Sequence, residues 1–228
     1  MRTVINSIND YYPQLEAFVD YLHAVREDER VALARKIHDE LGGLLVSAAM
    51  DVGWAKSHTP SEDVRARLQR SSVSLASAID MERNMIEQLR PTLLDNLGLF
   101  DALGWYFKNS CHRRDVICSQ AYPEMKFVLA PPALSNIFRA VQTLLDCTFL
   151  EEDLRSVDLV ATFSDDGLSI RVGHEHRAVE TVDVSQRFRH ELTSTAHRLA
   201  ALGGQLSIDR HESGSEFYVQ IPLMRDGQ

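Results

Sequence analysis

The chain has 228 residues, and its 33 acidic side chains outnumber its 24 lysines and arginines, which gives a formal net charge of -9 at pH 7. This acidic balance argues against a nucleic-acid partner, because phosphate backbones are bound by clustered basic side chains. The sequence has no apolar run of about 18 residues and no apolar core near its N-terminus, so we expect neither a membrane span nor a signal peptide, and we expect a cytoplasmic protein.

Residues 1–26 carry apolar side chains at spacings of three and four, and Pro13 interrupts the pattern. Because proline ends or kinks a helix, we expect a short segment, a break, and then a helix that continues into the next stretch. This helix would lengthen a helical bundle or a dimer contact.

Residues 29–45 are predicted to form the helix around which the rest of the chain is organised. Apolar residues recur along it at spacings of three and four, which makes one seam for packing against partner helices. The seam residues are Ala34, Ile37, Leu41, Leu44 and Ala48.

His38 lies beside this seam, so we expect its side chain at the edge of the bundle. Asp39 follows it directly and Arg35 precedes it by one turn. Two glycines, Gly42 and Gly43, stand together one turn later, although each costs about 1 kcal/mol in a helix interior relative to alanine. They indicate either a close helix crossing or bare backbone that lets another protein reach the imidazole.

A second long helix, residues 64–93, is predicted after a break in which Thr59 or Ser61 is the N-cap. Pro91 should kink or end this helix. The two long helices would pair antiparallel, and such a hairpin leaves much of its apolar seam uncovered. We therefore expect a homodimer whose two copies close a four-helix bundle, with residues 1–97 as the dimerisation domain.

The remaining residues, 98–228, form a second predicted domain in which helices alternate with antiparallel strands, as in an α/β layer. The expected helices are 98–113, 132–150 and 184–202, and the expected strands are 116–122, 157–163, 168–172, 205–209 and 216–222. The predicted fold class is therefore α+β. Cys111, Cys118 and Cys147 are odd in number and form no CxxC pair, so we expect free thiols in a reducing cytosol.

Three stretches of this sequence resemble one protein family. Residues 29–45, with Ala-Arg-Lys-Ile-His-Asp-Glu-Leu-Gly at their centre, closely resemble the phosphoacceptor-histidine box of bacterial two-component sensor kinases, in the subgroup whose histidine is followed by an acid. Residues 86–99 resemble the end of the second dimerisation helix of that subgroup. Residues 198–222 resemble the last part of the ATP-binding domain, so the resemblance implies a histidine-kinase-type α/β sandwich after the hairpin.

The sequence departs from this family at the positions that serve ATP. Where the family has a glutamate and an asparagine near the nucleotide and its Mg²⁺, this chain has Thr143 and Cys147, and a thiol is a poor ligand for a hard cation. The family's Asp-x-Gly turn is replaced by residues 173–176, and its glycine-rich lid by residues 186–190. The glutamine used by family members that act as phosphatases is replaced by Gly43. We therefore expect a degenerate domain without ATP, other cofactor or metal, and no phosphatase activity.

Two short polar motifs in this domain have an ordinary structural interpretation. Asp165, Asp166 and Gly167 stand between two predicted strands and are typical of a hairpin turn. His174, Glu175 and His176 are interpreted as a polar loop rather than as a metal site.

The resemblance implies a function for the part that is intact. We expect a histidine phosphotransfer protein in which His38 accepts a phosphoryl group from one response-regulator receiver domain and passes it to another. Asp39 would hold the second ring nitrogen, and Arg35 or Lys36 would steady the phosphoryl oxygens. Mg²⁺ would come with the receiver domain. The alternatives are an active histidine kinase with a divergent nucleotide site and a non-catalytic pseudokinase scaffold that binds a receiver domain or a kinase.

Overall fold

The computed structural model of the chain describes residues 3–5, 13–112, 114–123, 131–164, 166–177 and 187–222. The chain divides into two compact units. One comprises Ala17–Thr92, and the other comprises Met1–Glu16 with Leu93–Gln228. Compared with the expected boundary at residue 97, the short helix after Pro91 and the first residues of the chain belong with the sheet.

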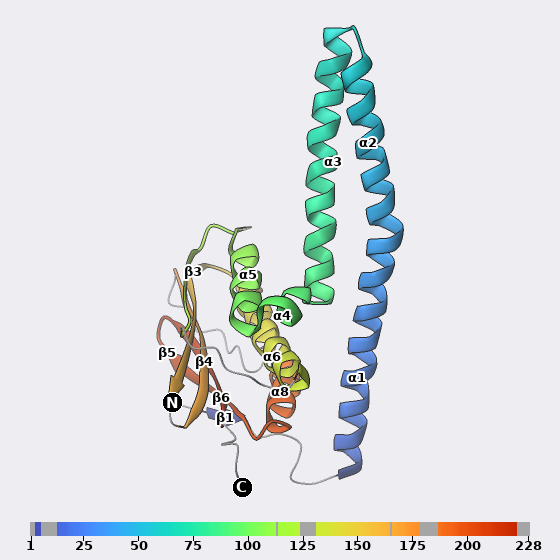
Figure 1. Ribbon diagram of the computed structural model, residues 1–228. Helices are drawn as coiled ribbons and strands as arrows, with labels where there is room; N and C mark the ends of the chain where they lie inside the picture. Colours follow the sequence, from blue (N-terminus) through green and yellow to red (C-terminus); the bar gives the residue numbers. More distant parts are fainter. Residues whose placement is uncertain are drawn as a thin grey trace. The chain divides into compact units, whose positions relative to one another are not determined.

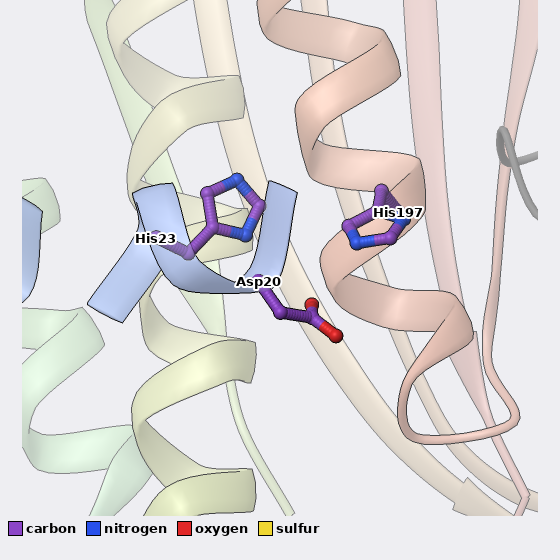
Figure 2. A group of neighbouring side chains, drawn as sticks. All are labelled: Asp20, His23 and His197. Carbon is purple, nitrogen blue, oxygen red and sulfur yellow. The ribbon is translucent and has the colours of Figure 1, made fainter. Parts of the chain in front are cut away.

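The first unit is a hairpin of two long helical arms (Figure 1). The ascending arm consists of α1 (Pro13–Lys36), a π-helical segment (Ile37–Gly42) and α2 (Gly43–His58), and the returning arm is α3 (Glu62–Leu89). Asp20 and His23 lie one turn apart near the start of the ascending arm (Figure 2).

The boundaries of the helices follow from local chemistry. The Ser61 hydroxyl accepts a hydrogen bond from the N–H of Val64 at 3.4 Å and so caps α3. This confirms one of the two expected caps. The helix ends at Leu89, two residues before Pro91, as expected for a residue that cannot continue the backbone hydrogen-bond ladder. No helix in the described parts of the chain combines the length and apolar character that a membrane crossing requires.

The second unit has a six-stranded sheet in the order β1-β5-β6-β4-β3-β2, with β2 and β3 parallel and the other pairs antiparallel. Its strands are β1 (Thr3–Ile5), β2 (Ile117–Ala121), β3 (Leu154–Ser164), β4 (Gly167–His176), β5 (Gln205–His211) and β6 (Gly214–Ile221). The helices are α4 (Thr92–Leu97), α5 (Leu99–Cys111), α6 (Pro131–Phe149) and α8 (Arg189–Ala200).

The helices α5, α6 and α8 lie on one side of this sheet (Figure 1). Between them is the core of the unit, which contains fully buried side chains from both layers, among them Phe107, Phe138, Leu159, Val172 and Phe217. On α8, the side chain of His197 is also buried (Figure 2). The expected α+β class, a helical part followed by a mixed sheet with helices, is confirmed.

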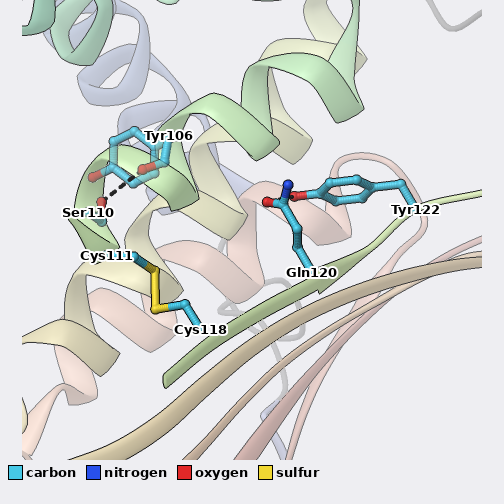
Figure 3. Close-up of a disulfide and its surroundings, with 6 residues drawn as sticks. All are labelled: Tyr106, Ser110, Cys111, Cys118, Gln120 and Tyr122. Carbon is cyan, nitrogen blue, oxygen red and sulfur yellow. Dashed lines mark hydrogen bonds between the residues drawn. A yellow bond between two sulfur atoms is a disulfide. The ribbon is translucent and has the colours of Figure 1, made fainter. Parts of the chain in front are cut away.

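The short segment expected before Pro13 contains a strand, residues 3–5, that pairs with β5, and residues 6–12 lie outside the described residues. The helix expected after the break begins at Pro13. Two other expectations for particular segments are wrong. Cys111 and Cys118 form a disulfide between the end of α5 and the start of β2 (Figure 3), because the two elements bring these residues together despite their separation of only seven positions. Cys147 alone is a free thiol.

The other wrong expectation lies at the end of β4. Residues 174–176 continue the strand and pair with β3 and β6 instead of forming a polar loop. Gly214 on β6 makes this pairing possible, because a side chain there would overlap the carbonyl oxygen of His174. The predicted hairpin between β3 and β4 is confirmed, with Ser164 opposite Gly167, although Asp165 lies outside the described residues.

Candidate functional site

The candidate site in the hairpin is centred on His38, which lies in the π-helical segment. Its side chain is 73% exposed, as expected for a residue beside the seam. Asp39, Arg35 and Lys36 are exposed as well. Within the described residues, no hydrogen bond or ion pair joins Asp39 to the imidazole, so the structure shows the two side chains as neighbours in sequence only.

The acid that approaches His38 comes from the other arm of the hairpin. Glu82 on α3 places its Oε1 3.7 Å from Nδ1 of His38, and its side chain is only 5% exposed. No hydrogen-bond partner for this oxygen exists within the described residues. Glu82 is thus a nearly buried carboxylate whose neighbour is an exposed imidazole.

Gly42 provides the space that this carboxylate occupies. A Cβ atom at Gly42 would lie 3.0 Å from Oε1 of Glu82 and 3.8 Å from Nδ1 of His38. The neighbouring Gly43 has nothing within 4 Å of the corresponding position. Of the two explanations given for the paired glycines, a close approach between the arms fits Gly42, whereas Gly43 is exposed backbone.

The π-helical segment changes which side chains face the partner arm. One extra residue per turn shifts the register of all residues that follow relative to an α-helix. Ala34, before the segment, is 2% exposed, but Leu41 and Leu44 are 43% and 70% exposed. In the single chain, Leu41 and Leu44 of the predicted seam therefore face solvent, whereas Ala48 is half-buried.

Glu82 was missed by the sequence reasoning, although a signal was present. Ile79, Glu82, Ile86 and Leu89 follow one another at spacings of three and four, so the glutamate occupies a position on the apolar stripe of α3. A charged residue at such a position is expected to be buried with a partner. Nothing in one sequence, however, identifies that partner on the other arm.

In the second unit, the side chains that replace the family's nucleotide contacts are engaged or buried. The Thr143 hydroxyl donates to the carbonyl oxygen of Arg139 at 2.9 Å, one turn earlier on α6. Cys147 is 2% exposed, and burial raises the pKa of its thiol to about 12. A buried, protonated thiol is not a ligand for a hard divalent cation.

The side chains at the positions of the family's Asp-x-Gly turn and glycine-rich lid are also buried where the structure describes them. His174 stands at the first position after Gly173, is 2% exposed, and has its pKa lowered to about 4 by burial and by the nearby His176 and His211. Phe188, in the stretch that replaces the glycine-rich lid, is 7% exposed and belongs to the core. Gln186, at the start of that stretch, lies outside the described residues.

Polar side chains of α5 and α6 bond to one another. The Tyr106 hydroxyl donates to Asp146, and burial is the largest cause that raises the pKa of this tyrosine above its usual range. Arg139 is buried and donates to the amide oxygen of Gln142 at 2.8 Å. Figure 3 shows Tyr106 one turn before the disulfide, with its carbonyl oxygen accepting from the Ser110 hydroxyl. These polar groups are used within the unit.

Comparisons with known proteins agree with the sequence resemblance. Residues 29–94 match the family model HisKA_3, described as histidine kinase. The chain is 26% identical over 218 residues to the sensor histidine kinase MctS of Rhizobium johnstonii, which covers 92% of this chain and 46% of that protein. It is also 29% identical over 85 residues to the oxygen sensor histidine kinase NreB of Staphylococcus carnosus, covering 37% of this chain and 24% of that protein.

The chain thus spans less than half the length of either of these relatives. Among solved structures, it is similar to the histidine kinase domain of a blue-light activated kinase from Erythrobacter litoralis, with a TM-score of 0.46 and 16% identity over 78% of this chain and 96% of that one. The histidine kinase AdeS of Acinetobacter baumannii gives a TM-score of 0.44 and 14% identity, covering 79% and 96%.

Proposed function

We propose that the protein is a histidine phosphotransfer protein. The starting point is the two-component histidine kinase core that the family match at residues 29–94 and the similar sensor kinases identify in this chain. His38 would accept a phosphoryl group from the aspartate of one receiver domain and pass it to another. The observation that carries the proposal is the 73% exposure of His38 inside the matched phosphoacceptor region. A phosphoryl carrier needs an accessible ring nitrogen, and this side chain has one.

We leave ATP out because the positions at which the resemblance places the family's contacts to Mg²⁺ and the nucleotide carry other side chains in this chain. Oxygen ligands are preferred by Mg²⁺, whereas Thr143 uses its hydroxyl within α6 and Cys147 is buried. The strand β4 continues through His174 where the family has a turn toward the base. Mg²⁺ would then be supplied by the receiver domain.

The surface around His38 supports docking of a folded partner. Arg35 lies one turn before His38 and Lys36 lies two residues before it, and both are exposed. One of them would hold the phosphoryl oxygens, where charge-assisted hydrogen bonds are strong. Gly43 offers backbone without a side chain. Because phosphoryl transfer depends mainly on positioning and charge stabilisation, these features are enough for a carrier. Receiver domains are the partners that we propose, and the cytoplasm is the proposed location.

We also propose that two copies associate through the hairpin. Among the described side chains of this unit, only those of Ala34, Glu82 and Pro91 are buried in the single chain. Large apolar side chains on α2 and α3 are exposed: Leu44, Val46, Met50, Trp54, Val64, Val73, Met81 and Met85. Burying them against a second copy would form a four-helix bundle. A monomeric mass in light scattering at micromolar concentration would contradict this.

The central experiment uses purified receiver domains that carry ³²P from labelled acetyl phosphate. Wild-type protein is expected to take up the label in an acid-labile, base-stable form, as expected for phosphohistidine. His38→Gln should abolish the uptake. His58→Gln is the matched control because His58 is another exposed histidine on the same arm, and this variant should be labelled like the wild type. No label on the wild type, or label that survives His38→Gln, would reject the proposal.

The same proteins separate the two alternatives. Incorporation of the γ-phosphate of ATP into His38 would identify an active kinase with a divergent nucleotide site. Binding of Mg²⁺-ATP would also raise the stability by about 2.7 kcal/mol at a concentration 100 times its Kd, and we expect no such increase. Binding of a receiver domain without transfer of label would identify a pseudokinase scaffold.

A further inference from the structure

We propose that Glu82 is the positioning residue for His38: it holds the Nδ1–H of the imidazole and leaves Nε2 free to receive the phosphoryl group. The evidence is the geometry of the hairpin, and the consequence for phosphoryl transfer rests on the proposed function. It assigns to α3 a role that the sequence pattern gave to Asp39.

Glu82 is the acid that approaches the ring of His38. Its Oε1 lies 3.7 Å from Nδ1 of His38, whereas no hydrogen bond or ion pair joins Asp39 to the ring within the described residues. The distance exceeds that of a hydrogen bond, but hydrogen bonds at reactive groups are often long in an unliganded protein and shorten in the complex. We propose that the exposed imidazole rotates to close this gap when the receiver domain binds.

Placing Glu82 in the apolar stripe of α3 costs stability. A carboxylate that is 5% exposed and whose Oε1 lacks a hydrogen-bond partner is unfavourable in a helical seam. An apolar residue would pack there at no such cost, as Ile79 and Ile86 do on the same stripe. Gly42 adds a further cost to the ascending arm, because it gives up a side chain where Glu82 needs space. Two unfavourable choices that meet at one imidazole indicate a site.

The chemistry of phosphoryl transfer requires a lone pair on one ring nitrogen of His38. A neutral imidazole with its proton on Nδ1 has a lone pair on Nε2. This lone pair forms the bond to phosphorus while the bond from phosphorus to the aspartyl oxygen of the receiver breaks, and the electron pair leaves with the aspartate carboxylate. The ring becomes a phosphorylated imidazolium whose Nδ1 proton faces Glu82, so the carboxylate neutralises the charge that develops. Transfer to a second receiver reverses the same steps.

The test begins with the unphosphorylated protein. Nitrogen-15 and proton NMR of the histidine rings, at a pH where His38 is neutral, reports which ring nitrogen carries the proton, and His38→Gln identifies the signals. We expect the Nδ1–H form to predominate in the wild type. Glu82→Gln should make the Nε2–H form predominate, because an amide N–H facing Nδ1 selects the opposite tautomer. Asp80→Asn removes an exposed acid of the same helix and should leave the wild-type ratio unchanged.

The second measurement is the rate of label transfer from the phosphorylated receiver domain. Glu82→Gln is expected to lower it by about 10–100-fold, the range found for carboxylates that orient metal-binding histidines, with the circular dichroism spectrum retained. Asp80→Asn should transfer at the wild-type rate. A predominant Nε2–H form in the wild type, or a ratio that responds to Asp39→Asn and not to Glu82→Gln, would overturn the proposal. A wild type that takes up no label would reject the relay, while the tautomer ratio would still decide the role of Glu82.

Discussion

Replacing Gly42 by alanine tests the packing that the site depends on. Gly42 has α-type backbone angles, φ -59° and ψ -45°, and Gly43 is nearly the same at -58° and -43°. Alanine is favoured over glycine in a helix by about 1 kcal/mol. At Gly43 the added methyl group meets nothing within 4 Å, so Gly43→Ala should raise the free energy of unfolding by about this amount.

At Gly42 the gain should be lost. The new Cβ would lie 3.0 Å from Oε1 and 3.6 Å from the carboxyl carbon of Glu82. The carboxylate must then give way by a few tenths of an ångström, and because it is nearly buried we expect this overpacking to cost about 1 kcal/mol. We expect Gly42→Ala to leave the free energy of unfolding near that of the wild type and to displace Glu82 from His38.

Urea unfolding followed by circular dichroism at one fixed protein concentration measures both changes. A double-mutant cycle then isolates the contact. In a Glu82→Ala background, the methyl group of Gly42→Ala has room, and the full gain of about 1 kcal/mol should return. If Gly42→Ala and Gly43→Ala are equally stabilising in the wild-type background, the approach of Glu82 to Gly42 is wrong.

Three further predictions address separate features. Burial lowers the pKa of His174 to about 4, against 6.5 in the unfolded chain, so the unfolded state binds more protons between these two pH values. The free energy of unfolding should therefore fall by about 3 kcal/mol as the pH drops from 6.5 to 4. Urea titrations of His174→Leu should no longer show this pH dependence. Reducing the Cys111–Cys118 disulfide, which closes a short loop, should lower the free energy of unfolding by about 2–3 kcal/mol, whereas an unchanged midpoint in reductant would contradict its contribution. Glu82→Met should raise the free energy of unfolding by about 1–4 kcal/mol, since a buried charge is replaced by an apolar side chain of similar size, and a loss of stability would show that Glu82 has a stabilising partner.

The regular elements could be predicted from the sequence because each is specified by its own residues. The break before α3 follows from Ser61, the end of that helix from Pro91, and the β3–β4 hairpin from the turn residues beside Gly167. The exposure of His38 could be predicted from its place beside the seam. In each case a local pattern decides a local structure.

The features that could not be predicted depend on residues far apart in the chain. The strand at residues 3–5 exists because β5, about 200 residues later, offers an edge for pairing. The disulfide requires that α5 and β2 converge, which no count of cysteines shows. The π-helical segment at residues 37–42 has no signature in the apolar spacing. Leu41, within it, and Leu44, just after it, are exposed in the single chain.

Glu82 illustrates how a functional residue can be recognised by what it costs. A helix such as α3 gains stability when every position of its stripe is apolar, so an acid at one of these positions lowers the stability of the fold. The same holds for Gly42 on the facing arm. Each residue alone is a neutral irregularity, but a Cβ at Gly42 would meet both Glu82 and Nδ1 of His38, and Oε1 of Glu82 lies 3.7 Å from the same nitrogen. If the hairpin existed only to join two copies, replacing Glu82 by methionine would improve it without loss. The relay requires the opposite outcome, in which the more stable protein carries phosphate more slowly.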